Sequence, residues 1–487
     1  MSALSFTTGM HTQAILKPSF LSHRSSSHPR NRVSLTSPAT ATVRATFSDP
    51  FVLQLAETLE DSLPTSSSSA VQSLRDTSSQ SLLSTPWPSI KDEKFRFTDT
   101  SFIKSYNIEP ISQSPVIDCS GHDEEGAQSI DLYITDGFVS SSATSLSDLP
   151  DGVYVGSLSG LSNDSQIQHI NNILGEISAQ RDLFWSVNGL GTPDIAIIYV
   201  AAGVRLDAQI HLKYLSILGN DKDSKNLPVS NPRVLVVVED GGEVEIVEEF
   251  MCDESGLEKI YWANSVTEIV IGKGAKVLHS YLQGQSLHSA HTKWTSVQQE
   301  SDSTYEVVEI STGGKLSRHN LDIQQLGPDT VTKMSTFHLC VTNQTQDLHS
   351  RLILDHPRGI SQQLHKCIVA HSQGQAVFDG NVQVNRYAQQ TDAGQLTRSL
   401  LLEPRATVNV KPNLQIIADD VKCSHGAAIC DLEENQLFYF QARGIDLETA
   451  RKALILSFAG EVVSSLPNSS IRKKVQNSVK LLLDSYL

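Results

Sequence analysis

A cysteine and a histidine lie two positions apart, at Cys423 and His425, where a strand-like stretch gives way to a helical tail. Upstream, apolar residues mostly alternate with polar ones over residues 413–421, a period that is typical of a β-strand. Side chains two positions apart on a strand point to the same face, so the thiol and the imidazole can lie side by side. Zinc, iron–sulfur centres and other soft metals prefer these two ligands. The pair predicts half of a metal or sulfur site, completed from elsewhere.

The remaining cysteines and acids are weaker candidates. His365 and Cys367 repeat the same spacing in reverse order, but packing explains such a pair more often than metal binding. Asp419 and Asp420 end a strand, where acidic residues usually serve a turn. No CxxC pair is present, so the sequence excludes a zinc ribbon or a thioredoxin-type redox motif. The six cysteines are Cys119, Cys252, Cys340, Cys367, Cys423 and Cys430.

The sequence carries no catalytic motif. Residues 356–359, His-Pro-Arg-Gly, are not accompanied by a serine nucleophile elbow or a glycine-rich phosphate loop. Residues 272–277, GKGAKV, lack the spacing of a Walker A loop. We therefore expect any use of ATP to come from a partner protein.

The first 48 residues form a separate block. They contain five basic residues, no acidic residue and many serines and threonines, without a long apolar run. This composition is typical of an organelle transit peptide. The excess of serine favours a chloroplast over a mitochondrial address. A disordered basic tail is the alternative interpretation.

The rest of the chain is acidic and has no membrane-spanning pattern. The net charge of the 487 residues is −16, and it becomes more negative once the basic leader is removed. Such a charge argues against nucleic-acid binding through phosphate neutralisation. The longest apolar run, residues 195–204, is about half of what a membrane-spanning helix requires.

Three further regions follow the leader. Residues 49–150 are mixed, with amphipathic helices expected at 50–63 and 70–83. From residue 151 to 428 the chain is a succession of short strand-like runs punctuated by glycine at irregular intervals. Sandwich, barrel and β-solenoid all remain open, and the length favours the solenoid.

Residues 429–487 have helical periodicity. Asp431 is the expected N-cap of a first helix, with Glu434 three residues on, and Asp446 is the expected N-cap of a second. The last helix carries an apolar stripe, which either docks on the chain's own body or binds a partner. Its members are Ile471, Val475, Val479, Leu482, Leu483 and Tyr486.

Three segments carry a resemblance to a known family. They are KPNLQIIADDVKCSHGAA with LFYFQARGI (residues 411–428 and 437–445), AVFDGNVQVNRYAQQTDAGQLTRSLLLEP (376–404) and ARKALILSFAGEVV (450–463). The sequence resembles SufD, a core subunit of the SUF iron–sulfur cluster assembly scaffold, in these segments and over most of the chain after about residue 180. The resemblance implies a right-handed parallel β-helix with a small N-terminal α+β region and a C-terminal helical module.

The resemblance also implies a function. The chain would be a non-catalytic scaffold subunit in the chloroplast stroma that pairs with SufB, and forms a homodimer when alone. By motif, His425 would help to build a transient iron–sulfur cluster at the SufB interface, with Cys423 as the accompanying thiol. The C-terminal helices would dock the ATPase SufC, for which we single out Leu437, Phe440, Leu454 and Phe458. A reduced flavin in the assembled complex is a further implication, although no flavin motif is visible.

Two other interpretations stay open. The chain could be SufB itself, although SufB tends to carry a different motif around its key cysteine. It could also be a β-helical carbohydrate-active enzyme, which would need clustered carboxylates and aromatic platforms along a cleft. The low aromatic content of 6% and the dispersed acids speak against this second alternative.

Overall fold

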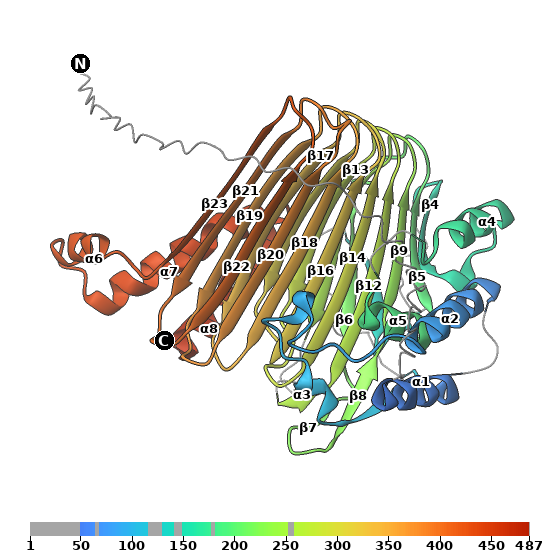
Figure 1. The fold of residues 1–487 in the computed structure, drawn as a ribbon, viewed down its shortest axis with the longest axis horizontal. Helices are drawn as coiled ribbons and strands as arrows, with labels where there is room; N and C mark the ends of the chain where they lie inside the picture. The colour runs from blue at the N-terminus through green and yellow to red at the C-terminus, as the bar shows by residue number, and fades with distance from the viewer. Residues whose placement is uncertain are drawn as a thin grey trace, which may run out of the picture. The chain divides into compact units, whose positions relative to one another are not determined.

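The computed structural model describes residues 49–63, 68–114, 129–140, 149–176, 181–251 and 258–486. Two long sheets lie face to face, and the chain alternates between them to form a β-solenoid of about six turns, which confirms the predicted mainly-β fold (Figure 1). The transit peptide expected at residues 1–48 lies outside the described residues.

The strand order follows from this winding. Apart from two antiparallel pairs at the start of the solenoid, the neighbours within both long sheets are parallel. The first sheet has the order β22 (Thr407–Ile416), β20 (Gln375–Val384), β18 (Thr345–Leu354), β16 (Leu316–Gln325), β14 (Ala290–Gln299), β12 (Trp262–Ile271), β9 (Arg233–Val238), β5 (Ile195–Val200) and β4 (Val153–Ser157), with β8 (Asn226–Ser230) pairing β12 and β1 (Asn107–Pro110) pairing β8. The second has the order β23 (Lys422–Cys430), β21 (Asp392–Leu401), β19 (Ile360–Val369), β17 (Val331–Cys340), β15 (Thr304–Ser311), β13 (Lys276–Gln283), β10 (Glu243–Met251), β6 (Gln209–Leu215), β2 (Ser129–Thr135) and β3 (Phe138–Val139). A small separate pair joins β7 (Asn220–Asp221) to β11 (Lys259–Ile260).

One corner of the solenoid repeats in every coil. Its turn residue has a positive φ, and its amide N–H donates to the carbonyl of the residue just before the equivalent position in the next coil. The Asp302 amide, for example, donates to the Pro328 carbonyl at 2.9 Å. The turn residues are Gly203, Gly241, Gly274, Asp302, Asp329, Arg358 and Gln390. The repeat therefore exists, at intervals of roughly 30 residues, but glycine marks only its first three members.

Helices cover the outer faces of both sheets. On the first sheet lie the N-terminal elements α1 (Pro50–Ser62), α2 (Ser69–Leu82), η1 (Glu93–Phe95), α3 (Ser101–Lys104), η3 (Leu158–Gly160), α4 (Asp164–Ile173) and α5 (Leu183–Gly191). On the second lie α7 (Leu447–Val463) and α8 (Ser469–Tyr486). The helices expected at 50–63 and 70–83 are confirmed as α1 and α2.

The apolar stripe of α8 packs on the chain's own body. Ile471, Val475, Val479 and Leu483 are buried in the cluster that α7 and α8 form with the outer face of the second sheet. Self-docking is therefore confirmed for these four residues and for the partly buried Leu482, whereas Tyr486 is 46% exposed. Asp446 is also the N-cap of α7, as predicted, and its carboxylate accepts a hydrogen bond from the Thr449 amide at 2.9 Å.

The predicted N-cap at Asp431 is wrong. The strand β23 continues to Cys430, and α6 (Glu434–Gln441) begins three residues after Asp431 with Glu433 at its N-cap position. The Asp431 carboxylate instead accepts a hydrogen bond from the next amide, that of Leu432, at 2.7 Å. The pairing of β23 with β21 extends the strand through the position where local sequence would start a helix.

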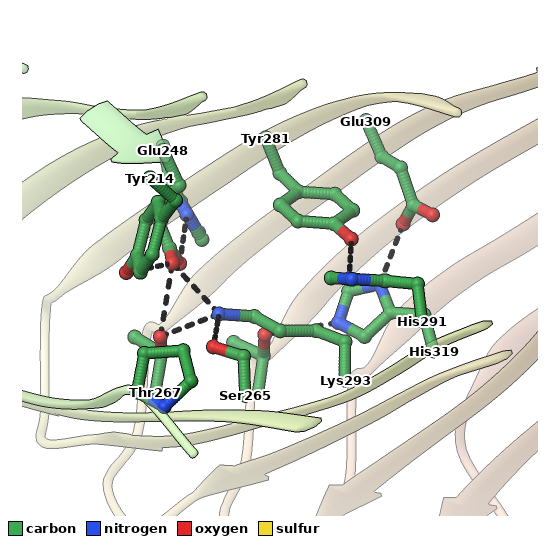
Figure 2. A network of polar contacts seen from close by, with 12 residues as sticks. Tyr214, Glu248, Ser265, Thr267, Tyr281, His291, Lys293, Glu309 and His319 are labelled. Atoms are coloured by element: carbon green, nitrogen blue, oxygen red, sulfur yellow. Dashed lines mark hydrogen bonds and ion pairs between the residues drawn. The ribbon is translucent and has the colours of Figure 1, made fainter. Parts of the chain in front are cut away.

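The middle coils enclose a buried polar network (Figure 2). At its centre the Glu248 carboxylate lies 2.7 Å from the Lys293 ammonium and 3.0 Å from His279 Nε2, and it accepts hydrogen bonds from Tyr214 and Thr267. All five side chains are buried. Because an unpaired charge in an apolar interior is very costly, the arrangement is stable only with every partner in place.

A second carboxylate repeats this arrangement two coils further on, where Glu309 on β15 follows Tyr281 on β13 in the same row as Glu248. Glu309 lies between His319 Nδ1 at 2.8 Å and His338 Nε2 at 2.9 Å. Burial alone would raise the pKa values of Glu248 and Glu309, but Lys293 and His279 beside Glu248, and His319 and His338 beside Glu309, lower both well below the ordinary range. Both groups therefore stabilise the fold above the pKa of an unfolded glutamate, about 4.3, and this contribution is lost as the pH falls below it.

We expect Lys293→Met to destabilise the protein strongly, because it leaves the Glu248 carboxylate buried without its ammonium. Breaking a buried pair in this way costs about 3–5 kcal/mol of unfolding free energy, measurable by urea denaturation. Lys333→Met is the control, since its pair with Glu306 is largely exposed and should contribute less than about 1 kcal/mol. Equal losses in the two variants would contradict a stabilising role for the interior network.

Candidate functional site

Cys423 and His425 lie on β23, the last strand of the second sheet (Figure 1). This strand pairs with β21 on one side, and β22 pairs with β20 in the same way. In the described part of the chain, no strand pairs with the opposite side of either one. The end of the solenoid thus presents two strand edges with free backbone donors and acceptors.

The register places both side chains over the interior of the solenoid. His425 is opposite Gln395, which is buried, and Cys423 is opposite the buried Ala393. His425 is nevertheless exposed, because the described chain has no coil above it. Cys423 is half-buried and packs against the interior apolar cluster. The two potential ligands therefore share the inward face of the last coil.

The environment of Cys423 sets its protonation state. Burial raises the pKa of the thiol, the negative charge of Asp392 raises it further, and one backbone hydrogen bond opposes the change. The thiol is therefore protonated at neutral pH. Because thiolate is the form that binds a metal, ligation at Cys423 must release a proton.

The other candidate residues lie apart from this pair. Cys430 is exposed on the opposite face of β23, opposite Leu400. Cys367 and His365 are fully buried in the interior, where burial raises the pKa of Cys367 to about 12. This outcome confirms packing as the role of the second cysteine–histidine pair. Among the described residues, no group of three or more Cys, His, Asp or Glu side chains is placed to hold a metal ion.

The residues expected to dock a partner fall into two groups. Leu437 and Phe440 are half-buried on α6, whereas the ring of Phe458 lies 4.0 Å from the Lys366 ammonium on the solenoid. Leu454 is half-buried on α7. Sequence reasoning missed the most exposed aromatics of α6, which are Phe438 at 71% and Tyr439 at 53%. The run Leu-Phe-Tyr-Phe was the available signal, because four consecutive large apolar residues cannot all face one side of a helix.

Comparison with known proteins identifies the family. Residues 50–212 match the SufBD protein N-terminal region, and residues 219–458 match the SufBD core domain of SUF system FeS cluster assembly. The chain is 61% identical over 460 residues to the protein ABCI7, chloroplastic, of Arabidopsis thaliana, covering 93% of this chain and 95% of that one. The chain belongs to the SufBD family of iron–sulfur cluster assembly proteins.

Two further SufBD relatives agree with this assignment. An iron–sulfur cluster assembly SufBD family protein of Synechocystis is 36% identical over 402 residues, 80% of this chain and 86% of that one. The iron–sulfur cluster assembly protein SufD of Escherichia coli is 31% identical over 238 residues, 48% of this chain and 55% of that one. The resemblance to SufD found in the sequence is confirmed.

The SufBD core match covers the parts of the molecule described above. It spans the coils from β7 to β23, including the Cys423–His425 pair and all of the buried network except Tyr214, and it extends through α6 into α7. No helix among the described residues combines the length and apolar content needed to cross a membrane.

We expect metal binding at this pair to strengthen as the pH rises. Because burial raises the pKa of the Cys423 thiol, a metal must displace its proton at every pH below that value. Titration with Zn²⁺ as a probe between pH 6.5 and 8.5 should show tighter binding and proton release, up to about tenfold per pH unit for one proton. Cys423→Ser should remove the proton release. Binding that is independent of pH would show that the thiol is not a ligand.

Proposed function

We propose that this chain is a scaffold subunit without catalytic activity of its own, which pairs with a SufB-type subunit and assembles iron–sulfur clusters in the chloroplast. The observation that most directly supports this proposal is the uncovered end of the solenoid, where the strand edges and the Cys423–His425 pair lie together. The chloroplast address rests on the leader at residues 1–48 and on the Arabidopsis relative whose name includes that location.

The two strand edges favour pairing with another sheet protein. Long edges with unpaired amides and carbonyls recruit further strands, and proteins usually shorten, charge or cover them. β22 contains Pro412, which lacks an amide donor, whereas β23 has nine residues without proline. β23 also presents Ile429, which is 50% exposed. A sister solenoid docked against β23 would bury this edge, and a second copy of this chain could use it when the sister is absent.

The same docking would complete the ligand set. Cys423 and His425 offer one sulfur and one nitrogen, whereas stable sites for tetrahedral metals use four ligands. A SufB-type subunit stacked on this end would contribute the others, and the nascent cluster, as cargo, would sit between the two chains. Because half of the ligands belong to each subunit, separating the subunits would release the cluster.

ATP hydrolysis would be supplied by a SufC-type partner. The sequence has no Walker A spacing of its own. α6 offers a docking surface, because none of its residues is buried and Phe438 and Tyr439 project from it. Exposed aromatic side chains are common anchors at protein interfaces.

The central test is His425→Ala in a complex co-expressed with SufB- and SufC-type subunits. His425 is exposed and makes no contact that the fold requires, so the complex should assemble as the native one does. The yield of reconstituted cluster, followed by its visible absorbance, should fall at least tenfold, in the range for loss of a metal-site partner. Cluster formation at the native rate would refute the site assignment.

A second test addresses α6. Replacing both Phe438 and Tyr439 by serine should abolish co-purification of the SufC-type ATPase, because the two rings would supply most of the apolar area of the contact. Circular dichroism should not change and the loss of thermal stability should be small, because both side chains are exposed and Tyr439 contacts Arg443 just beyond the same helix. Leu481→Ser is the matched control, because Leu481 is 67% exposed on α8. ATPase binding by the double variant would place the docking surface elsewhere.

A further inference from the structure

A buried lysine fixes α7 to the late coils of the solenoid. Lys366 projects from the outer face of β19, and its side chain is only 2% exposed. Its ammonium donates to the Phe458 carbonyl at 2.8 Å and to the Glu461 carboxylate at 2.5 Å, and lies 4.0 Å from the centre of the Phe458 ring. The rest of the contact between α7 and the sheet is mainly apolar. Lys366 therefore supplies hydrogen bonds of fixed direction within an interface that is otherwise apolar.

The same carboxylate also reaches the next strand. Arg398 on β21 lies opposite Lys366, and its guanidinium is 3.7 Å from Glu461. The following position in this row is Ala428 on β23, opposite Arg398. Glu461 thus holds two adjacent strands, and the second of them is hydrogen-bonded along its length to the strand that carries Cys423 and His425.

The other end of this helix leaves the solenoid. α7 contacts β15, β17 and β19 through its C-terminal half, whereas α6 contacts α7 and has no buried residue. In Figure 1, α6 and the start of α7 project past β23, beyond the last coil. Each residue of a helix adds 1.5 Å, and Ile455 is the first buried α7 residue in the cluster on the second sheet, so the eight steps from Leu447 to Ile455 form an arm of about 12 Å.

We propose that Glu461, clamped by Lys366 and Arg398, is the fulcrum through which movement of the α6–α7 arm reaches the cluster site on β23. This inference rests on the proposed function, because it assigns the ATPase to the arm and the cluster to β23. A protein that pulls on α6 turns α7 about its anchored end. The charged contact transmits that turn to β19 and β21, and the backbone ladder carries it to β23.

The chemistry of the anchor makes it suited to this role. Apolar contacts between α7 and the sheet tolerate small slides, since neighbouring methyl groups are interchangeable as partners. The buried Lys366 ammonium has both of its partners, the Phe458 carbonyl and the Glu461 carboxylate, on α7, so a slide of the helix would break both hydrogen bonds in a place that water does not reach. The hydrogen bond from Lys366 lowers the pKa of Glu461, so the carboxylate is ionised at physiological pH and can accept that bond.

The test compares Glu461→Gln with Glu448→Gln in the complex with SufB- and SufC-type subunits. Both variants remove one carboxylate from α7, but Glu448 pairs with Lys452 of the same helix and not with the solenoid. For Glu461→Gln we expect native binding of the ATPase and a loss of at least about fivefold in the stimulation of cluster formation by ATP, the lower limit for coupled sites. Glu448→Gln should keep the native stimulation.

Hydrogen exchange on the isolated chain gives a readout that does not depend on clusters. Glu461→Gln should increase the exchange of the amides of residues 392–401 and 422–430, and Glu448→Gln should not. Native ATP stimulation in Glu461→Gln, or loss of ATPase binding by it, would overturn the proposal. If His425→Ala abolishes cluster formation while Glu461→Gln retains native coupling, only the fulcrum fails. If His425→Ala forms clusters normally, the proposed function fails instead.

Discussion

Each coil of this solenoid completes the backbone hydrogen bonds of the coil before it. The first and last coils therefore have strands with a neighbour on one side only. At the N-terminal end, the antiparallel pairs β4–β5 and β2–β3 change the strand direction. At the C-terminal end, β22 and β23 remain open in the described chain. The candidate pair Cys423 and His425 lies at this second end, where the described chain leaves inward-facing side chains accessible.

The buried network explains how so long a stack keeps its register. A slip of one residue would turn Glu248 and Lys293 from the interior to the outer face and would bring apolar residues of the covered face inside. An apolar interior alone would penalise such a slip less, because many aliphatic side chains can replace one another. The charged groups accept only partners at particular positions on the facing sheet. The network therefore favours a single register for the middle coils, on which the later coils up to β23 stack.

Much of the fold and of the candidate site could be predicted from local sequence patterns. Period-two alternation indicated the strands, and Asp446 marked the start of α7. The same-face placement of Cys423 and His425 followed from strand geometry once β23 existed. Asp431 failed because it satisfies a helix-start pattern, while the hydrogen bonds to β21 that override it come from a distant segment. The local sequence around Asp431 contains no information about its pairing with β21.

Two other features could not be predicted for the same reason. The turn repeat is carried by glycine in the early coils, but by Asp302, Asp329, Arg358 and Gln390 later, so a search for glycine finds no period. Charged residues such as Lys293 would ordinarily be assigned to the surface. Its partner Glu248 lies 45 positions away on the opposite sheet, and only the winding of the chain brings the two together.

The three cysteines around the end of the solenoid show why the edge position suits a scaffold. Cys367, inside the stack, has a pKa raised to about 12, so its thiol is inert toward metals. Cys430, on the outer face of β23, is open to solvent and has no interior histidine beside it. Cys423 lies between these extremes, because it is half-buried and on the same face as His425. Under the proposed function, a ligand held in this way would bind its cargo while the subunits are joined and would release it when they separate.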